Sequence, residues 1–563
     1  MFAWTIYLSF SGVACLMALK PEDVRSARLV AMVTSVGGLL VALVGAGQFN
    51  PGAGLTTVAK VPWVSALGLE YHLAVDGISV TLVVLTGLAA VAGVLFSWNI
   101  EFQTKRFFAF YLALIGGVYG VFLSFDLFLL FVFYELAIVP KYFLIAGWGT
   151  TRREYGAMKL ALYSFVGSAM ILAGLLAAYV VAGATTFNLV ELAKFPFPRG
   201  FQMWAFPLVF TGFAVLAGLW PFHSWAPTGH VAAPTAASML LAGVIMKLGA
   251  YGCLRVAMTL FPLGLHDWAS PVLGFASWRD VFGVLAVIGI VYGAMVALVQ
   301  RDFKFVIGYS SVSHMGFVIL GLMTLSVIGL SGAVLQMFSH GVIAGLLFAV
   351  VGRMVYDRTH TRVLDELELL GLNRALPFAA GTFVVAGLAS MGMPGFSGFV
   401  AEFQVLIGAW KAFPTLAVLA GVGVLVGVAY TLRAMQKAFF SASDLAPTSA
   451  ELAGAELAGA PAPALEPVGT MGAMGSGHVG PSHSVAAARA GEWPERAALG
   501  TGSSGPGHSG HGLGDISIPE RLGATLLIAL TLLIGVYPRL LLDWIEPALH
   551  SPLMEQVLKA GDR

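Results

Sequence analysis

Apolar runs of membrane-spanning length recur along the chain and restrict its fold more than any other feature. An α-helix needs about 20 apolar residues to cross the hydrocarbon core of a bilayer. Windows of that length predict fourteen spans. The runs are blocks and do not alternate, which excludes a membrane β-barrel. The predicted spans cover residues 2–19, 28–47, 74–98, 106–123, 126–148, 157–183, 203–220, 236–260, 280–300, 304–325, 328–352, 375–408, 414–440 and 522–545.

The composition excludes a soluble enzyme of this size. Hydrophobic residues make up 58% of the 563 residues and charged residues only 10%, against about 25% charged residues in soluble domains. The net charge of +1 gives no indication of nucleic-acid binding. Cys15 and Cys253 both fall in predicted spans and show no metal or disulfide spacing. We therefore predict an all-α polytopic membrane protein with about fourteen transmembrane helices.

Two predicted spans contain helix-breaking residues. The seventh ends in GLWPFHSWAPTGHVAAPT, and the twelfth contains ASMGMPGFSGF. Proline removes a backbone donor, and such breaks at membrane depth are tolerated where they line a wet or protein-filled cavity. The breaks lie five helices apart, so equivalent helices of two five-helix units would run in opposite directions, as in inverted-repeat transporters. The alternative interpretation is a pair of ordinary proline kinks.

These features predict five regions. Residues 1–105 form helices one to three, residues 106–260 a first five-helix repeat, and residues 280–440 a second, inverted repeat. Residues 441–520, rich in Gly, Ala, Pro and Ser, are predicted to be a disordered loop. Residues 521–563 hold the last helix and a tail.

The loop carries no predicted site. Its GSGHVG and GTGSSG sequences match the dinucleotide pattern, but neither follows a strand or opens a helix. Its four histidines, taken in this composition, favour a solvated tract over a metal site. Lys and Arg concentrate in alternate short loops, and the positive-inside rule then places both termini outside and this loop in the cytoplasm.

Ionisable residues deep in apolar spans are the candidate functional residues. A charge in hydrocarbon costs at least a few kcal/mol, so such residues usually pair or relay protons or ions. Glutamate, lysine and histidine can exchange protons near neutral pH, whereas arginine stays charged. We predict a proton path through Glu135, Lys247, His314, His340 and Glu402.

Simpler roles remain open for several of these residues. Lys247 could instead reach an interface with its long side chain, although apolar residues extend on both sides of it. His314 and His340 could be hydrogen-bonded packing residues. Asp76 and Asp126 stand near span ends, where we expect them to cap helices or face water.

Three further residues are secondary candidates. His223 and His230 flank the break in the seventh span, and either shuttle protons or cap the break. Lys141 follows Glu135 by six residues, and either pairs with a group on another helix or reaches the inner interface.

Five segments resemble the antiporter-like membrane subunits of respiratory complex I, in particular the chain M (chain 4) family. The resemblance covers residues 1–440 and the last helix, and it implies fourteen helices with inverted repeats and broken helices seven and twelve. It also implies a proton-translocating subunit of a bacterial inner membrane. The segments are FVFYELAIVPKYFLIAGWG, PFHSWAPTGHVAAPTAASMLLAGVIMKLGAYGCLR, GYSSVSHMGFV, FSHGVIAGLLF and GMPGFSGFVAEF.

The resemblance assigns a place to each candidate. Glu135 matches the family's helix-five glutamate and Lys247 its central helix-eight lysine. His314 and His340 match the histidines that connect the centre to helix twelve, where Glu402 matches the terminal glutamate. Chains L and N, and the D subunit of multisubunit sodium/proton antiporters, usually carry lysine at that last position, so the glutamate favours chain M.

The resemblance also implies what the chain lacks and what it joins. No metal site or redox centre is expected in it, with NAD, FMN, iron–sulfur clusters and quinone bound by partner subunits. The expected partners are chains of the L and N type and the lipid bilayer, not nucleic acid. Alternative functions are a subunit of a multisubunit sodium/proton antiporter, or of a hydrogenase-linked or carbonic-anhydrase-linked membrane complex.

One position departs from the family pattern. The family has a lysine on helix seven that pairs with the helix-five glutamate. Ungapped alignment through FAVLAGLWPFHSW places Leu216 there. The usual partner of Glu135 is therefore missing, and Lys141 is the candidate substitute.

Residues 441–520 are predicted to be dispensable for proton translocation. Their composition cannot bury enough apolar area to offset the entropy of ordering. Deleting most of them while keeping a short linker should leave assembly and proton pumping nearly intact in membrane vesicles. Loss of assembly would instead identify the segment as a docking element.

Overall fold

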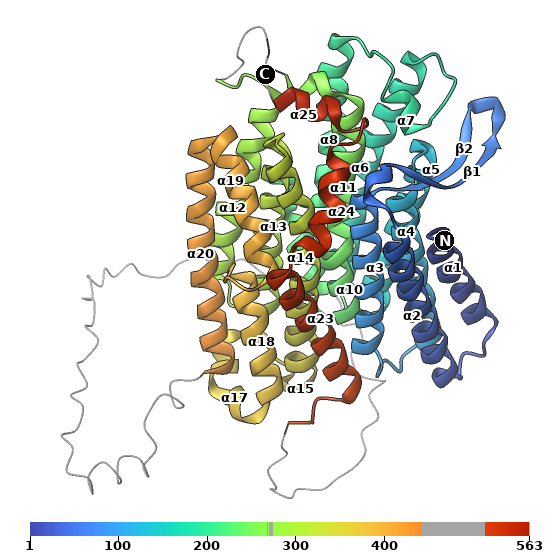
Figure 1. The fold of residues 1–563 in the computed structure, drawn as a ribbon. Helices are drawn as coiled ribbons and strands as arrows, with labels where there is room; N and C mark the ends of the chain where they lie inside the picture. The colour runs from blue at the N-terminus through green and yellow to red at the C-terminus, as the bar shows by residue number, and fades with distance from the viewer. Residues whose placement is uncertain (267, 269–273, 441–512, 562–563) are drawn as a thin grey trace, which may run out of the picture. The chain divides into compact units, whose positions relative to one another are not determined.

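Long apolar helices run side by side through the described part of the chain (Figure 1). The structure is a computed structural model that describes residues 1–266, 268, 274–440 and 513–561. Within these ranges, 12 helices are long and apolar enough to cross a membrane. The predicted helical membrane fold is confirmed, whereas the number of fourteen and the inverted repeats stay predictions. The predicted loop lies almost wholly outside the described residues.

The first part of the chain holds the helices that lead to the first break. They are α1 (Ala3–Ala18), α2 (Val24–Gln48), α3 (Gly77–Phe96), α4 (Thr104–Leu123), α5 (Leu127–Trp148), α6 (Arg153–Val181) and the short α7 (Leu189–Leu192). Asp76 and Asp126 cap α3 and α5, as expected, by accepting hydrogen bonds from Ser79 N and Leu129 N, both at 2.9 Å. Their carboxylates satisfy backbone donors that a helix start leaves free.

A two-stranded antiparallel hairpin between α2 and α3 was not predicted. Strands β1 (Thr56–Val64) and β2 (Leu69–Val75) pair with Lys60 opposite His72. The alternation of polar and apolar residues in LEYHLAV is the signal that the search for apolar runs missed. The Asn188 amide nitrogen contacts His72 Nδ1 at 3.1 Å, which joins the hairpin to the start of α7. Burial lowers the pKa of His72, and the nearby Lys60 lowers it further.

The break in the seventh span is present. Helix α8 (Arg199–Ala217) ends at Gly218, whose φ of +82° is easily adopted only by glycine. The chain resumes as η3 (Phe222–Ser224) and α9 (Trp225–Ala232). The turn itself is exposed at Pro221 and Phe222, whereas α9 beyond it is almost entirely buried.

The break in the twelfth span is also present. Helix α18 (Pro377–Ser390) and helix α19 (Ser397–Ala412) are separate, and the turn between them contains Gly392 and Gly395 at positive φ. Glu402 lies on the second of these helices, just over one turn from its start.

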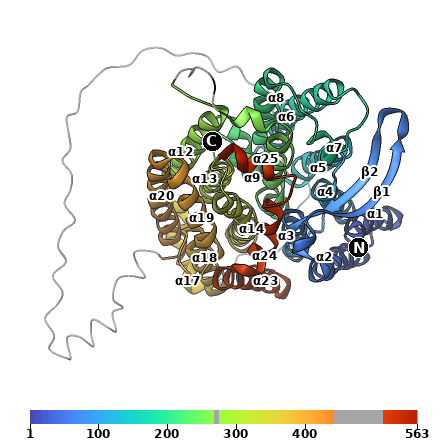
Figure 2. The same cartoon turned by 45° about the horizontal axis from the view of Figure 1, so that its top comes forward.

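The two most buried spans lie in the middle of the bundle. One is the helical run α10 (Thr235–Leu240), η4 (Leu241–Ile245), α11 (Met246–Gly252) and η5 (Cys253–Met258), in which η4 and η5 are π-helical. The other is α14 (Val327–Ala349) with its π-helical continuation η7 (Val350–Tyr356). Both are fully buried over their most apolar windows, unlike α2 or α20 (Pro414–Phe439). Figure 2 shows α14 surrounded by the other helices.

The remaining helices complete the second part of the chain. They are α12 (Trp278–Val299), α13 (Phe303–Met323), the short α15 (Asp357–Thr359), α16 (Leu364–Leu367) and α17 (Leu372–Ala375), then α20 (Pro414–Phe439), α23 (Ile518–Val536), α24 (Arg539–Leu549) and α25 (Glu555–Gly561). The predicted last span, 522–545, was wrong as a single helix. The helix is interrupted at Pro538, between α23 and α24, because proline has no N–H to donate the next helical hydrogen bond.

A buried ion pair closes one end of the central run. Arg255 on η5 is fully buried and pairs with Asp76 at the start of α3. Its guanidinium also lies over the rings of Phe125 and Tyr251, at 5.3 and 5.5 Å from their centroids. A buried charge is tolerated here because it is paired and stacked.

Glycines let the two central helices approach closely. A Cβ added at Gly341 on α14 would lie 2.6 Å from the carbonyl oxygen of Gly243 on η4, a backbone atom that cannot move aside cheaply. Gly341→Ala is therefore expected to destabilise the protein by about 1–3 kcal/mol through overpacking.

Gly345→Ala is the matched control for this substitution. Gly345 lies one turn along the same helix, and a Cβ there would meet no atom within 4 Å. Thermal unfolding of the purified variants should show a lower Tm for the Gly341 change only. Equal Tm values for both variants would contradict the close packing.

Candidate functional site

Lys247 and His340 form a direct contact between the two central helices. The Lys247 ammonium lies 2.8 Å from His340 Nδ1 and also donates to the carbonyl oxygen of Ala242. Lys247 is fully buried, so it does not reach an interface as the alternative interpretation proposed. The accepting carbonyl belongs to π-helical η4, five residues before Lys247. A π-helical segment changes which carbonyls are available to side chains, and such segments are frequent at functional sites.

His314 and Glu402 form a second contact on the other side of His340. His314 Nδ1 on α13 lies 2.8 Å from Glu402 Oε1 on α19, and His314 Nε2 lies 3.1 Å from the Ser390 hydroxyl at the end of α18. Both residues are nearly buried, with 9% of His314 and 5% of Glu402 exposed. The break between α18 and α19 is thus held against α13 by the same histidine.

The two contacts are joined through the imidazole pair. The rings of His314 and His340 lie 5.4 Å apart between centroids, at 34° to each other. His340 Nε2 is buried and has no hydrogen-bond partner among the described residues. Both rings line one small cavity together with Glu402, with a volume of about 10 Å³. A cavity of that size holds at most a single water molecule, and the buried ring nitrogen is the group that such a water would satisfy.

Sequence reasoning missed Gln336. Its amide nitrogen donates to Glu402 Oε1 at 2.9 Å, and its side chain lines the same cavity. The signal was available in VLQMFSHG, because residues 336 and 340 are four apart and share one helix face. A buried glutamine in an apolar helix needs partners as much as a histidine does.

The structure does not place Glu135 in this line. Glu135 lies on α5, where its Oε1 atom is buried without a hydrogen-bond partner in the described ranges. Four of the five predicted path residues are therefore brought together by the contacts above. The fifth lies near Lys141, whose own contacts are described below.

The two secondary histidines differ in their surroundings. His230 on α9 is fully buried, stacks on Phe348 at 4.8 Å between centroids, and has neither ring nitrogen hydrogen-bonded to a described group. His223 on η3 packs edge-on against Tyr292 at 5.2 Å, with Nδ1 likewise unpartnered. Neither ring nitrogen of His230 caps the helix break.

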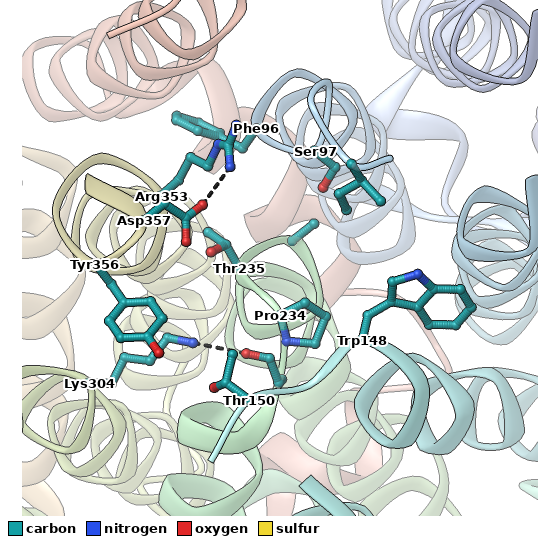
Figure 3. A pocket seen from close by; sticks show the side chains of 13 residues that line it. Phe96, Ser97, Trp148, Thr150, Pro234, Thr235, Lys304, Arg353, Tyr356 and Asp357 are labelled. Atoms are coloured by element: carbon teal, nitrogen blue, oxygen red, sulfur yellow. Dashed lines mark hydrogen bonds and ion pairs between the residues drawn. The ribbon is translucent and has the colours of Figure 1, made fainter. Parts of the chain in front are cut away.

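A larger pocket opens beside the start of the Lys247 run. It has a volume of about 130 Å³ and is lined in part by the 233–236 segment of that run, which begins three residues after His230. Figure 3 shows the Lys304 ammonium directed at the carbonyl oxygen of Ala233, 2.9 Å away. Arg353 and Asp357, four residues apart on one helical run, pair with each other at 2.5 Å on one wall of the same pocket. The pocket is therefore lined by charged groups and hydroxyls, and one of its walls lies three residues along the chain from the buried His230.

The Gln336 contact predicts a measurable effect on stability. Gln336→Leu removes one of the two contacts to Glu402 Oε1, and losing a hydrogen bond to a charged group costs about 1.5–3 kcal/mol. Gln404→Leu is the matched control, because this glutamine stands two residues from Glu402 and its Oε1 atom has no described partner. Denaturant unfolding should separate the two variants. A Gln336 variant as stable as the control would show that the hydrogen bond contributes nothing.

Comparison with known proteins identifies the family. Residues 124–427 match the model of the family described as NADH:quinone oxidoreductase/Mrp antiporter, TM. NADH-quinone oxidoreductase subunit M of Rhodobacter capsulatus is 37% identical over 434 residues, which cover 75% of this chain and 81% of the relative. The subunit M of Pseudomonas aeruginosa is 37% identical over 462 residues, covering 78% and 88%.

Solved structures agree with these sequence matches. A chain of respiratory complex I from Thermus thermophilus with bound NADH superposes with a TM-score of 0.78 and 26% identity, covering 100% of both chains. A chain of the Mrp complex from Dietzia sp. shares the fold, with a TM-score of 0.75 at 18% identity over 100% of this chain and 99% of that one. The chain therefore belongs to the NADH:quinone oxidoreductase/Mrp antiporter family, as an antiporter-like subunit of the complex I type.

Proposed function

We propose that this chain is a proton-translocating membrane-arm subunit of an NADH:quinone oxidoreductase. The observation that carries the proposal is the buried line from Lys247 through His340 and His314 to Glu402. Ionisable groups in the interior of an apolar bundle destabilise the protein, so their presence there usually marks a pathway for protons or ions. The names of the relatives give the complex in which this transfer takes place.

Each contact in the line suits one proton step. His340 Nδ1 can accept a hydrogen bond from the Lys247 ammonium only if its ring is neutral, so its hydrogen is then on Nε2. A proton that Lys247 passes to Nδ1 allows another to leave from Nε2 into the cavity that His314 shares. His314 then faces the Glu402 carboxylate through its own Nδ1.

The pocket beside Lys304 supplies a route to the line. His230 lies close enough to both Lys304, which lines the pocket, and Lys247 to be influenced electrostatically by both. Its two unpartnered ring nitrogens give it the capacity to accept and release protons in opposite directions. We assign this pocket to the cytoplasmic side, with both chain termini on the outer side of a bacterial inner membrane.

The chemistry of the line favours protons over sodium ions. Hard cations take oxygen ligands, whereas the centre of this line offers the nitrogen atoms of Lys247, His340 and His314. In the described part of the chain, no group of three or more His, Cys, Asp or Glu side chains could hold a metal ion. A subunit of a sodium/proton antiporter, the second candidate, would need an oxygen-lined site on the path.

Partner subunits complete the proposal. Quinone reduction, with its NAD, FMN and iron–sulfur clusters, takes place in neighbouring subunits, and this chain responds through charge rearrangement. Neighbours of the chain L and chain N type would contact the helix faces that carry exposed apolar side chains, such as α1 and α20.

Lys247→Ala tests the proposal most simply. The variant should assemble, because removing a buried charge leaves no unpaired carboxylate beside it, yet lose most redox-driven proton pumping in membrane vesicles. Lys411→Ala is the matched control, because this lysine is solvent-exposed at the end of α19. Wild-type pumping by the Lys247 variant would remove Lys247 from the path.

A further inference from the structure

A second buried lysine lies outside the proton line. Lys141 on α5 is fully buried, and its ammonium donates to the Ser164 hydroxyl on α6 at 3.2 Å. Its nitrogen also lies 6.0 Å from the centroid of the Trp225 ring on α9. No described carboxylate lies within ion-pair distance of it. An ammonium has three donors, so one hydroxyl and one ring face leave this buried charge poorly compensated.

Its missing partner lies on the same helix. Glu135 stands six residues earlier, and its buried Oε1 atom accepts no hydrogen bond from a described group. Glu135 is also the charged residue that acts electrostatically on Lys141. Lys141 therefore lacks a carboxylate acceptor, and Glu135 lacks a hydrogen-bond donor.

The length of the lysine side chain decides whether the two groups can meet. Six residues correspond to about 9 Å along the helix axis and about 240° of rotation, so Glu135 and Lys141 leave α5 on different faces and only a long, flexible side chain can bridge them. Long side chains on a helix extend towards its N-terminus, which is the direction from Lys141 to Glu135. Pro140 lies between them and has no N–H to donate to the Leu136 carbonyl, which leaves a polar backbone atom on the way.

The broken helix opposite contributes no charge. Tyr134 of α5 and Phe213 of α8 pack at 5.6 Å between centroids, so the two helices meet beside Glu135. One turn further along α8 stands Leu216, which is 1% exposed. No lysine or arginine occurs in the 47 residues between Arg199 and Lys247. Any cation for Glu135 must come from another helix or from α5 itself.

We propose that Lys141 is the charge partner of Glu135, so that the ion pair at this end lies within one helix. In the structure the pair is open, with Ser164 and Trp225 holding the ammonium. A rotamer change of Lys141 towards Glu135 closes it. Opening and closing then need no movement of the broken seventh helix. The inference rests on the proposed function, because the pair would gate proton access to the line at Lys247.

Infrared spectroscopy of the assembled complex tests the pairing. Lys141→Met removes the cation that closes on Glu135, so a protonated-carboxyl absorption should increase over the wild type, in which the closed pair keeps part of the Glu135 population ionised. The double variant Glu135→Gln/Lys141→Met should lose that increase, which assigns it. Lys141→Arg keeps the positive charge and should show no such increase. A spectrum of Lys141→Met identical to the wild type would overturn the pairing.

A double-mutant cycle on pumping gives the functional test. Lys141→Met should lose most pumping, and adding Leu216→Lys should restore a large part of it, because a cation then approaches Glu135 from α8. Lys159→Met is the matched control: Lys159 lies on α6 and donates to the Thr228 hydroxyl at 3.3 Å, away from Glu135. Strictly additive effects of the two changes would overturn the proposal.

Failure of the pairing can be told apart from failure of the proposed function. If Lys141→Met pumps normally while Lys247→Ala does not, the pairing is wrong and the proton line stands. If neither change affects pumping, the proposed function is wrong. If Lys141→Met fails to assemble, rescue of assembly by Leu216→Lys supports the pairing, and failure of that rescue overturns it.

Discussion

The contact between Lys247 and His340 joins the two parts of the proposed proton line, and the close packing of two buried helices permits it. It joins the two most buried spans of the bundle, which come from the two halves of the chain. The backbones at Gly243 and Gly341 approach so closely that a Cβ at the second would collide with the first. A charge placed there has no access to bulk water, so its protons must move through neighbouring side chains or enclosed water.

Both interrupted spans carry residues of the proposed proton path or its secondary candidates. The break between α18 and α19 brings Ser390 and Glu402 to the two nitrogens of His314. The break between α8 and α9 is followed by His230, whose ring nitrogens are unpartnered and which precedes by three residues the 233–236 segment that lines the pocket beside Lys304. Irregular backbone at membrane depth is therefore found where polar side chains and cavities satisfy it.

Much of this fold follows from apolar periodicity, because spans of about 20 residues and their proline breaks are local features. The π-helical turns beside Lys247 and the hairpin near His72 were not predicted, since packing against distant segments determines them. Within the site, residue types in apolar runs identified Lys247 and Glu402. The order in which these residues contact one another could not be predicted from the sequence. Gln336 was missed because burying an uncharged amide costs less free energy than burying a charge, so it did not stand out in its apolar run.

The most direct test of this account replaces the residue in the middle of the line. His340→Leu keeps an apolar side chain of similar reach but removes both ring nitrogens, so Lys247 and His314 lose their connection. The quantity to measure is the number of protons pumped per electron by the intact complex in proteoliposomes. The account predicts a lower ratio with electron transfer retained. An unchanged ratio at full electron-transfer rate would contradict it.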